Sequence, residues 1–142
     1  MVKEISIRTV WERFSEDQRR KLDKEKWSQR LGGLFDMAIK EGHRVFVAED
    51  ENQSFLGYVW VGERSNLMTG TRHGYIYDVF VKEEHRRKGV GMILMEKAES
   101  YCRETGYTEM LLMVAINNQP AEKLYIKQGF KAEQKYMLKR LT

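Results

Sequence analysis

Cysteine and proline are almost missing from this chain, whose 142 residues include one of each, Cys102 and Pro120. A lone cysteine cannot form an internal disulfide, and the first residues lack the basic-then-apolar order of a secretory signal. No apolar run approaches the roughly 20 residues that cross a bilayer. These absences argue against a disulfide-stabilised secreted protein and against a membrane protein, and they predict a soluble protein of the reducing cytoplasm.

Metal ligands are also scarce. The 3 histidines and Cys102 are not grouped at any spacing typical of a metal site, so the sequence predicts no bound metal. Cys102 is expected to be a small core residue on a helix rather than a nucleophile.

Length and charge narrow the class further. A chain of 142 residues suffices for one domain, 1–142, and is too short for two of ordinary size. The net charge is +4, but the 25 cationic residues are spread among 21 acidic ones instead of forming one stripe. This mixture disfavours nucleic acid as a partner, because nucleic-acid binding relies on a concentrated basic surface.

The most informative stretch, residues 74–103, predicts a strand, a basic glycine loop and a helix. Residues 75–81 are rich in β-branched and aromatic side chains, which is typical of a buried strand. After the loop, apolar side chains recur every three or four positions, which indicates an amphipathic helix that Gly106 ends.

The loop between them has the composition of an anion site. It places three cations at residues 86–88 beside Gly89 and Gly91. The first-turn amides of the following helix have no partner inside the helix and lie at the positive end of its dipole. We therefore expect the backbone N–H groups of residues 86–92, with the cations around them, to hold a phosphate or pyrophosphate. The alternative is a solvated run of charge.

Two well-known phosphate loops do not fit this stretch. A mononucleotide P-loop continues with Gly-Lys-Ser/Thr, and a dinucleotide fingerprint needs a third glycine where this chain has Leu94. The spacing Arg86-x-x-Gly89-x-Gly91 instead resembles the Gln/Arg-x-x-Gly-x-Gly/Ala signature of the GCN5-related N-acetyltransferase (GNAT) superfamily.

A second signature of that superfamily is similar to a downstream segment, so that the resemblance covers about the last half of the chain. The matching segment is Asn118-x-x-Ala121-x-x-Leu124-Tyr125-x-x-x-Gly129-Phe130.

The resemblance implies acetyl-CoA as cosubstrate, with its pyrophosphate in the loop and its pantetheine arm along the backbone of Val79 and Val81. It also implies an α+β fold with a central, mostly antiparallel sheet flanked by helices, whose fourth and fifth strands splay apart near Val79 to Val81 and Val114. The implied cofactor-binding positions are Val79, Phe80, Val81, Arg86, Arg87, Lys88, Gly89, Val90, Gly91, Met92, Asn118 and Tyr125.

Elsewhere, periodicity and turn residues predict the remaining elements. The apolar run at 107–115 indicates a central strand covered on both faces. Gly57 indicates a bulge or a close backbone approach, and Gly32-Gly33 a break or bend. The predicted elements are strands at 5–10, 43–49, 54–63 and 130–141, two helical stretches within 11–40, a hairpin turn at 50–53 and a short helix at 120–127.

For catalysis, the resemblance places Tyr125 near the thioester sulfur, where it would stabilise the leaving thiolate; the alternative is a tyrosine packed in the core. Asp78 is the first candidate for the base that accepts the amine proton, with Glu63, His73 and His85 as alternatives.

Asn118 has two compatible interpretations: a contact with the pantetheine arm, as the resemblance implies, or a helix N-cap. The expected function is transfer of an acetyl group from acetyl-CoA to a primary amine, which could be a protein N-terminus, a lysine, a polyamine or a small amine. A non-catalytic CoA-binding module of the same fold and a nucleic-acid binder are the alternatives, and the resemblance is compatible with a homodimer.

Overall fold

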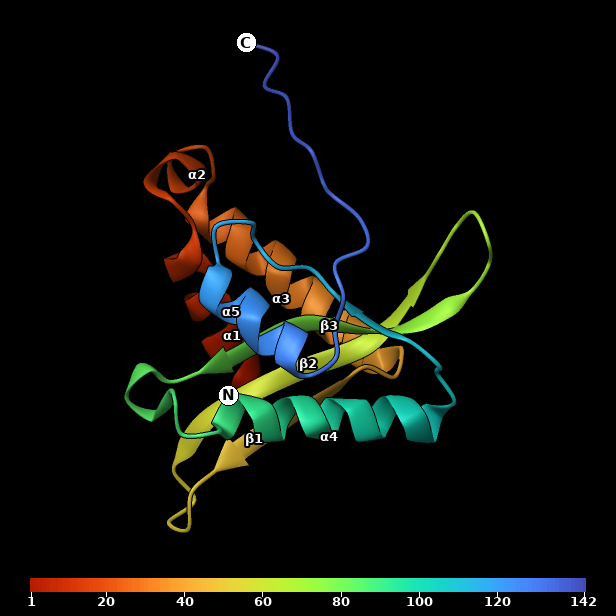
Figure 1. Ribbon diagram of the computed structural model, residues 1–142. Helices are drawn as coiled ribbons and strands as arrows, with labels where there is room; N and C mark the ends of the chain where they lie inside the picture. Colours follow the sequence, from red (N-terminus) through yellow and green to blue (C-terminus); the bar gives the residue numbers. More distant parts are fainter. The chain divides into compact units, whose positions relative to one another are not determined.

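A four-stranded mixed sheet organises residues 1–112 (Figure 1). Strands β1, β2 and β3 pair antiparallel, and β3 and β4 pair in parallel. The predicted α+β class with a mostly antiparallel sheet is therefore confirmed. The computed structural model describes residues 1–142, of which 113–142 form a second compact unit. The strands, in their order across the sheet, are β1 (Arg44–Glu49), β2 (Phe55–Ser65), β3 (Arg72–Val81) and β4 (Met110–Leu112).

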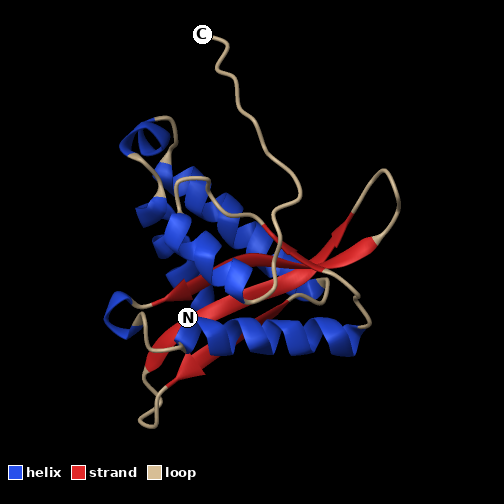
Figure 2. Cartoon of the chain, viewed as in Figure 1, coloured by secondary structure: helices blue, strands red, loops and turns tan.

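Helices cover both faces of this sheet (Figures 1 and 2). On one face the hydroxyl of Thr9 in α1 lies 3.4 Å from that of Tyr58. On the other face Tyr101 of α4 packs against Phe46, which pairs with Val59, the neighbour of Tyr58 along β2. The helices of residues 1–112 are α1 (Val2–Arg13), α2 (Glu16–Arg20), α3 (Lys24–Lys40), the short 3-10 helix η1 (Glu83–His85) and α4 (Val90–Thr105).

The hydrophobic core lies on both faces of the middle strands, against α4 on one side and against α1 and α3 on the other. Its buried side chains are mostly apolar or aromatic, so their removal from water stabilises the contact between sheet and helix. Cys102 lies among them, as predicted. The buried hydrophobic residues are Ala38, Tyr58, Val59, Trp60, Val61, Tyr75, Ile76, Leu94, Met95, Ala98 and Cys102.

The strand predicted at residues 5–10 is wrong, because this stretch lies within α1. The buried side of that helix is formed by two polar residues, Ser6 and Thr9. Ile5 and Ile7 lie two positions apart, one on each side of Ser6, and this spacing also fits a strand, which explains the wrong prediction. The hydroxyl of Thr9 donates to the carbonyl of Ser6 at 3.2 Å, so polar groups facing the sheet are partly satisfied inside the helix.

Two other local predictions have mixed outcomes. The two helical stretches within residues 11–40 are confirmed as α2 and α3, but α3 runs through Gly32 and Gly33 without a break. A Cβ at Gly32 would lie 3.6 Å from Ile7, an ordinary van der Waals contact, and one at Gly33 would meet nothing within 4 Å, so neither glycine marks a distortion of the helix.

The hairpin turn at 50–53 is confirmed. Asp50 Oδ1 accepts from the backbone N–H groups of Asn52 and Ser54, both at 2.9 Å, and Gln53 adopts a φ of 64°. This Asx geometry fixes the connection between β1 and β2. Gly57 follows in β2 at the predicted close approach, since a side chain there would overlap the carbonyl oxygen of Phe80.

The apolar run at 107–115 is not a central strand. Only β4 is paired there, and it lies at the edge of the sheet beside β3. The run is mostly leucine and methionine, which lack the β-branched shape that favours strands, and apolarity alone does not place a strand inside a sheet.

The second unit contains one helix, α5 (Gln119–Lys127), which Gly129 follows with a φ of 99°. This confirms the short helix predicted at 120–127. The strand predicted at 130–141 is wrong, because this segment has no regular secondary structure and residues 131–142 are exposed. Alternating side chains give a segment two faces but cannot supply the partner strand that a ladder needs.

Candidate functional site

The loop before α4 contains two residues in the left-handed region of backbone conformation. Arg87 has a φ of 65°, and Gly89, the N-cap of α4, has a φ of 83°. Glycine adopts such a conformation without strain, which explains its presence at the N-cap. These two turns bring the chain from the end of η1 into the first turn of α4.

Backbone donors accumulate at this turn. The first backbone bond at the start of α4 runs from Ile93 N to Gly89 O at 3.1 Å, and no side chain caps the helix. The N–H groups of residues 87–92 have no acceptor within the protein, whereas that of Arg86 donates to Glu83 O at 3.2 Å. The first turn of α4 also contains no acidic residue. The result is a row of free donors at the positive end of a long helix, with Arg87 and Lys88 exposed beside it.

The end of β3 next to this loop is an open edge. The pairing of β3 with β4 stops at Ile76, and a register shift leaves Tyr77 without an opposite residue on β2. Beyond that bulge, β3 has a strand partner on the β2 side only. The predicted splay near Val79 to Val81 and Val114 stays a prediction, because Val114 belongs to the second unit, residues 113–142.

Hydrogen bonding shows which backbone groups face the open edge. Lys82 N donates to Leu56 O at 2.8 Å, so Lys82 bonds toward β2. Because residues of an antiparallel pair alternate between bonding toward and away from the partner, the polar groups of Val79 and Val81 point away from β2. The carbonyl of Val81 accepts from Arg86 Nε at 2.9 Å, which ties the loop to the strand.

Asp78 lies at the bulge and is held by neighbours from two other elements. Its carboxylate accepts from Arg13 Nη2 at 2.9 and 3.0 Å and from the hydroxyl of Tyr58. Burial, and then the charge of Asp78, raises the pKa of Tyr58 to about 12, so this phenol remains a donor at neutral pH. Arg13 and Tyr58 were not predicted, because nothing in the sequence signals a contact across such separations.

The alternative base candidates lie apart from one another. Glu63 accepts from Tyr107 at 3.1 Å; burial, and then that bond, raises the pKa of Tyr107 to about 12. His73 lies 3.3 Å from Glu109 near the start of β3, whereas His85 belongs to η1 at the other end of that strand. The structure therefore does not gather these residues with Asp78 into one site.

Asn118 and Tyr125 belong to residues 113–142. The side chain of Asn118 accepts from Ala121 N at 3.4 Å, so it caps α5 as one of its two interpretations requires. The ring of Tyr125 makes an edge contact with Phe130 at 5.8 Å between centroids, and the tyrosine is half-buried.

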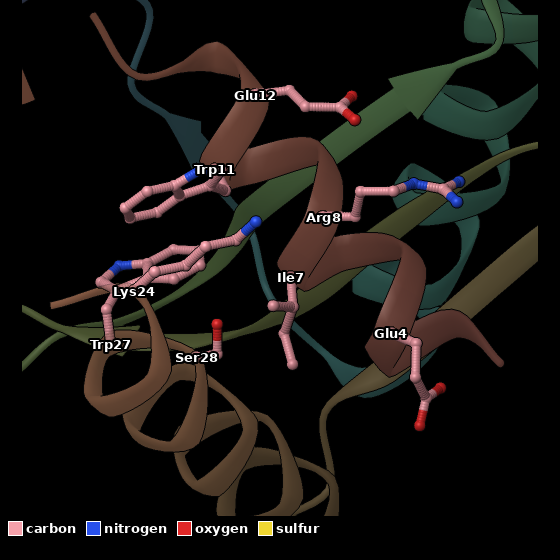
Figure 3. Close-up of a pocket in the computed structure, with 8 residues that line it drawn as sticks. All are labelled: Glu4, Ile7, Arg8, Trp11, Glu12, Lys24, Trp27 and Ser28. Atoms are coloured by element: carbon pink, nitrogen blue, oxygen red, sulfur yellow. The ribbon is translucent and has the colours of Figure 1, made fainter. Parts of the chain in front are cut away.

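A pocket of about 290 Å³ lies between α1 and α3, and no predicted site residue lines it (Figure 3). The rings of Trp11 and Trp27 lie 5.1 Å apart at one end, with Lys24 Nζ 5.6 Å from the centre of Trp11. The other lining residues are Glu4, Ile7, Arg8, Glu12 and Ser28.

No three His, Cys, Asp or Glu side chains come together as ligands of a metal ion would. None of the helices combines the length and the apolarity needed to cross a membrane.

Comparison with known proteins gives matches along most of the chain. The model of the "Acetyltransferase (GNAT) family" matches residues 7–130. A solved structure, "Putative acetyl transferase from Pyrococcus furiosus", is 31% identical with a TM-score of 0.80, covering 98% of this chain and 91% of that one. A structure of AAC(6')-Iy with a CoA bisubstrate analogue has a TM-score of 0.67 at 17% identity, covering 82% of this chain and 80% of that one, and shows similarity of fold.

Among curated proteins, an N-alpha-acetyltransferase of Saccharolobus solfataricus is 35% identical over 101 residues, which are 66% of this chain and 60% of that protein. The "GCN5-related N-acetyltransferase 7, chloroplastic" of Arabidopsis thaliana is 39% identical over 59 residues, 42% of this chain and 22% of that protein. The chain thus spans less than two thirds of the length of these curated relatives.

Proposed function

Because the chain belongs to the acetyltransferase (GNAT) family, whose members are acyltransferases, we propose that it transfers the acetyl group of acetyl-CoA directly to a primary amine. The observation that carries the proposal is the row of backbone donors at residues 87–92, which have no acceptor in the protein. It lies beside an open strand edge, so one ligand with a diphosphate and an amide-bearing arm would satisfy both features.

The grip on the cosubstrate comes from the loop and the edge of β3. The free N–H groups and the exposed side chains of Arg87 and Lys88 would bind the diphosphate, and Arg86, whose side chain donates to Val81, completes the loop. The outward backbone groups of Val79 and Val81, next to Phe80, would pair with the amides of the pantetheine arm as a further strand does. The full proposed set also includes Gly89, Val90, Gly91, Met92, Asn118 and Tyr125.

The reaction needs a neutral amine next to the thioester. Its nitrogen forms a bond to the carbonyl carbon, the carbon–sulfur bond breaks, and the thiolate leaves with the electron pair. We assign Tyr125 the role of hydrogen-bond donor to that sulfur. A phenol is ordinarily a weaker acid than a thiol, so the hydrogen bond stabilises developing charge without requiring full proton transfer.

The amine proton must also leave. Asp78 is our candidate acceptor for it, because it is the carboxylate at the bulge beside the open edge. Its Oδ2 accepts two hydrogen bonds, from Arg13 and Tyr58, whereas its Oδ1 accepts only one, from Arg13, so an acceptor site on Oδ1 remains for the amine proton. The variant Asp78→Asn tests this role. If Asp78 is the base, kcat should fall and its dependence on pH should change. If Asp78 has a purely structural role, the variant should only be less stable.

Acetyl-CoA binding and turnover can be measured separately. Calorimetry with CoA and release of free thiol from acetyl-CoA across an amine panel should show binding and acceptor-dependent thiol release. Binding without thiol release from any amine would favour the non-catalytic CoA-binding module, and absence of binding would reject both.

The panel should begin with peptides that have free N-termini. The similar protein of Saccharolobus solfataricus is an N-alpha-acetyltransferase, and an α-amine with a pKa near 8 is partly neutral at neutral pH. Lysine side chains, polyamines and small amines follow, and sedimentation of the same sample tests the proposed homodimer.

Replacing Tyr125 by phenylalanine should lower kcat by about 10- to 100-fold, the amount expected for one lost hydrogen bond to a charged group. The dissociation constant for CoA should change little, because the lost bond forms mainly as charge develops on sulfur. Steady-state kinetics and calorimetry on the same variant check this. An unchanged kcat would remove Tyr125 from the mechanism.

A further inference from the structure

The side chain of Arg86 is engaged with the protein although it lies on the surface. Its Nε donates to the carbonyl of Val81 at 2.9 Å, and its backbone N–H donates to Glu83 O at 3.2 Å. Arg86 is therefore fixed at both its main chain and its guanidinium. Arg87 and Lys88, the next two cations, make no hydrogen bond or ion pair with the protein.

The acceptor of this bond, the carbonyl of Val81, lies where β3 ends and the loop begins. Val81 is the last residue of β3, and its carbonyl points to the open edge, because Lys82 bonds toward β2. No strand pairs with β3 on that side, so the side chain of Arg86 supplies the hydrogen-bond donor for this carbonyl. The bond thus joins the end of the proposed pantetheine edge to the start of the row of free donors.

We propose that Arg86 is a positioning residue, which holds the anion loop against β3 through Val81 and contributes to cosubstrate binding mainly through this bond rather than through its charge. The inference rests on the proposed function and refines the role of one member of its site. The conformation that it stabilises is an uncommon one, since the next residue, Arg87, has a φ of 65°. A loop with a left-handed non-glycine residue needs an external restraint to remain ordered.

The two roles of an arginine can be separated by chemistry. Glutamine at this position retains an N–H donor for the carbonyl of Val81 and removes the charge, whereas methionine retains a similar length and removes both. Lys88→Gln is the matched control, because it removes one cation of the same loop that makes no bond to β3.

The experiment measures CoA affinity and steady-state kinetics for the wild type and the three variants. Arg86→Met should raise the dissociation constant of CoA and the KM for acetyl-CoA by roughly tenfold or more, with kcat nearly unchanged. Arg86→Gln should remain within about threefold of the wild type and keep most of its salt dependence. Equal losses in Arg86→Gln and Arg86→Met, with a reduced salt dependence in both, would overturn the proposal in favour of a charge role.

A second readout needs no ligand. Backbone ¹⁵N order parameters of residues 87–92 should fall in Arg86→Met and return toward wild-type values in Arg86→Gln. Identical order parameters in the wild type, Arg86→Met and Arg86→Gln would also overturn the positioning role. If the wild type did not bind CoA, the proposed function would fail, while this measurement would still decide whether Arg86 orders the loop. Circular dichroism and thermal unfolding confirm that each variant is folded.

Discussion

Among single residues, His43 connects the aromatic side chains on one face of the sheet. Its Nδ1 accepts from Trp60 Nε1 at 3.1 Å, and its ring lies 4.9 Å from that of Tyr77. Burial lowers the pKa of His43, with a partial opposite effect from the charges of Glu41 and Glu63. The imidazole is therefore neutral in the folded protein at neutral pH, and protonating Nδ1 would remove the acceptor for Trp60.

This arrangement predicts an acid-dependent loss of stability. The unfolded chain binds a proton at His43 near its ordinary pKa of about 6.5, before the folded protein does, so the free energy of unfolding falls as the pH drops below that value. Urea unfolding followed by tryptophan fluorescence at a series of pH values between 7.5 and 5 measures the effect. His43→Gln should show a weaker dependence on pH, and an unchanged dependence in that variant would contradict the assignment.

The same scale shows which features of the candidate site a sequence can predict. The unusual backbone conformation of Gly89 was predictable, because a glycine at the start of a helix has a local conformational reason. The bonds of Arg13 to Asp78 and of Arg86 to Val81 were not predictable, since each depends on where separate elements meet in space. The run of cations at residues 86–88 therefore predicted an anion site, but it did not show which of these cations bonds to the rest of the protein.

At the scale of elements, the hairpin of β2 and β3 depends on Gly57. A side chain there would overlap the carbonyl oxygen of Phe80 and lie 3.0 Å from Val81 Cα, and neither backbone atom can move without shifting β3. Since Val81 also accepts the bond from Arg86, a shift here would reach the proposed cosubstrate site.

Gly57→Ala should therefore destabilise the protein by about 1–3 kcal/mol, as overpacking does, and weaken CoA binding as well. The matched control is Gly33→Ala, where a side chain meets nothing within 4 Å on the exposed side of α3. This control should stabilise the protein by roughly 0.5–1 kcal/mol, because alanine favours a helix over glycine. Denaturant unfolding of both variants checks the signs, and equal stability of Gly57→Ala and the wild type would contradict the steric argument.

The elements that the sequence predicted correctly have a local signal, and those that it missed depend on partners. α4 has both an apolar stripe and a terminating glycine, Gly106. In contrast, α1 places Ser6 and Thr9 against the sheet, so its buried side carries no apolar stripe. The segment 130–141 has strand-like alternation but no paired strand, and pairing is a property of the assembled sheet rather than of a segment.

For the whole molecule, cosubstrate binding should appear as increased stability. The loop and the edge of β3, which carry the free backbone donors, belong to residues 1–112, and the family match covers residues 7–130. A ligand that binds the folded chain and not the unfolded one raises the free energy of unfolding.

CoA at 100 times its dissociation constant should add about 2.7 kcal/mol to the free energy of unfolding, a rise of several degrees in Tm for a chain of this size. Pantetheine at the same concentration should have a much smaller effect, because it lacks the diphosphate that the N–H groups of residues 87–92 would bind. Gly89→Val supplies the variant control: its position is open, but its φ of 83° strains a β-branched residue, so the loop should distort and the response to CoA should shrink. Differential scanning calorimetry across a CoA titration measures both effects. Equal shifts with CoA and pantetheine would mean that the row of donors before α4 contributes little to binding, and the anion site would have to be sought elsewhere on the chain.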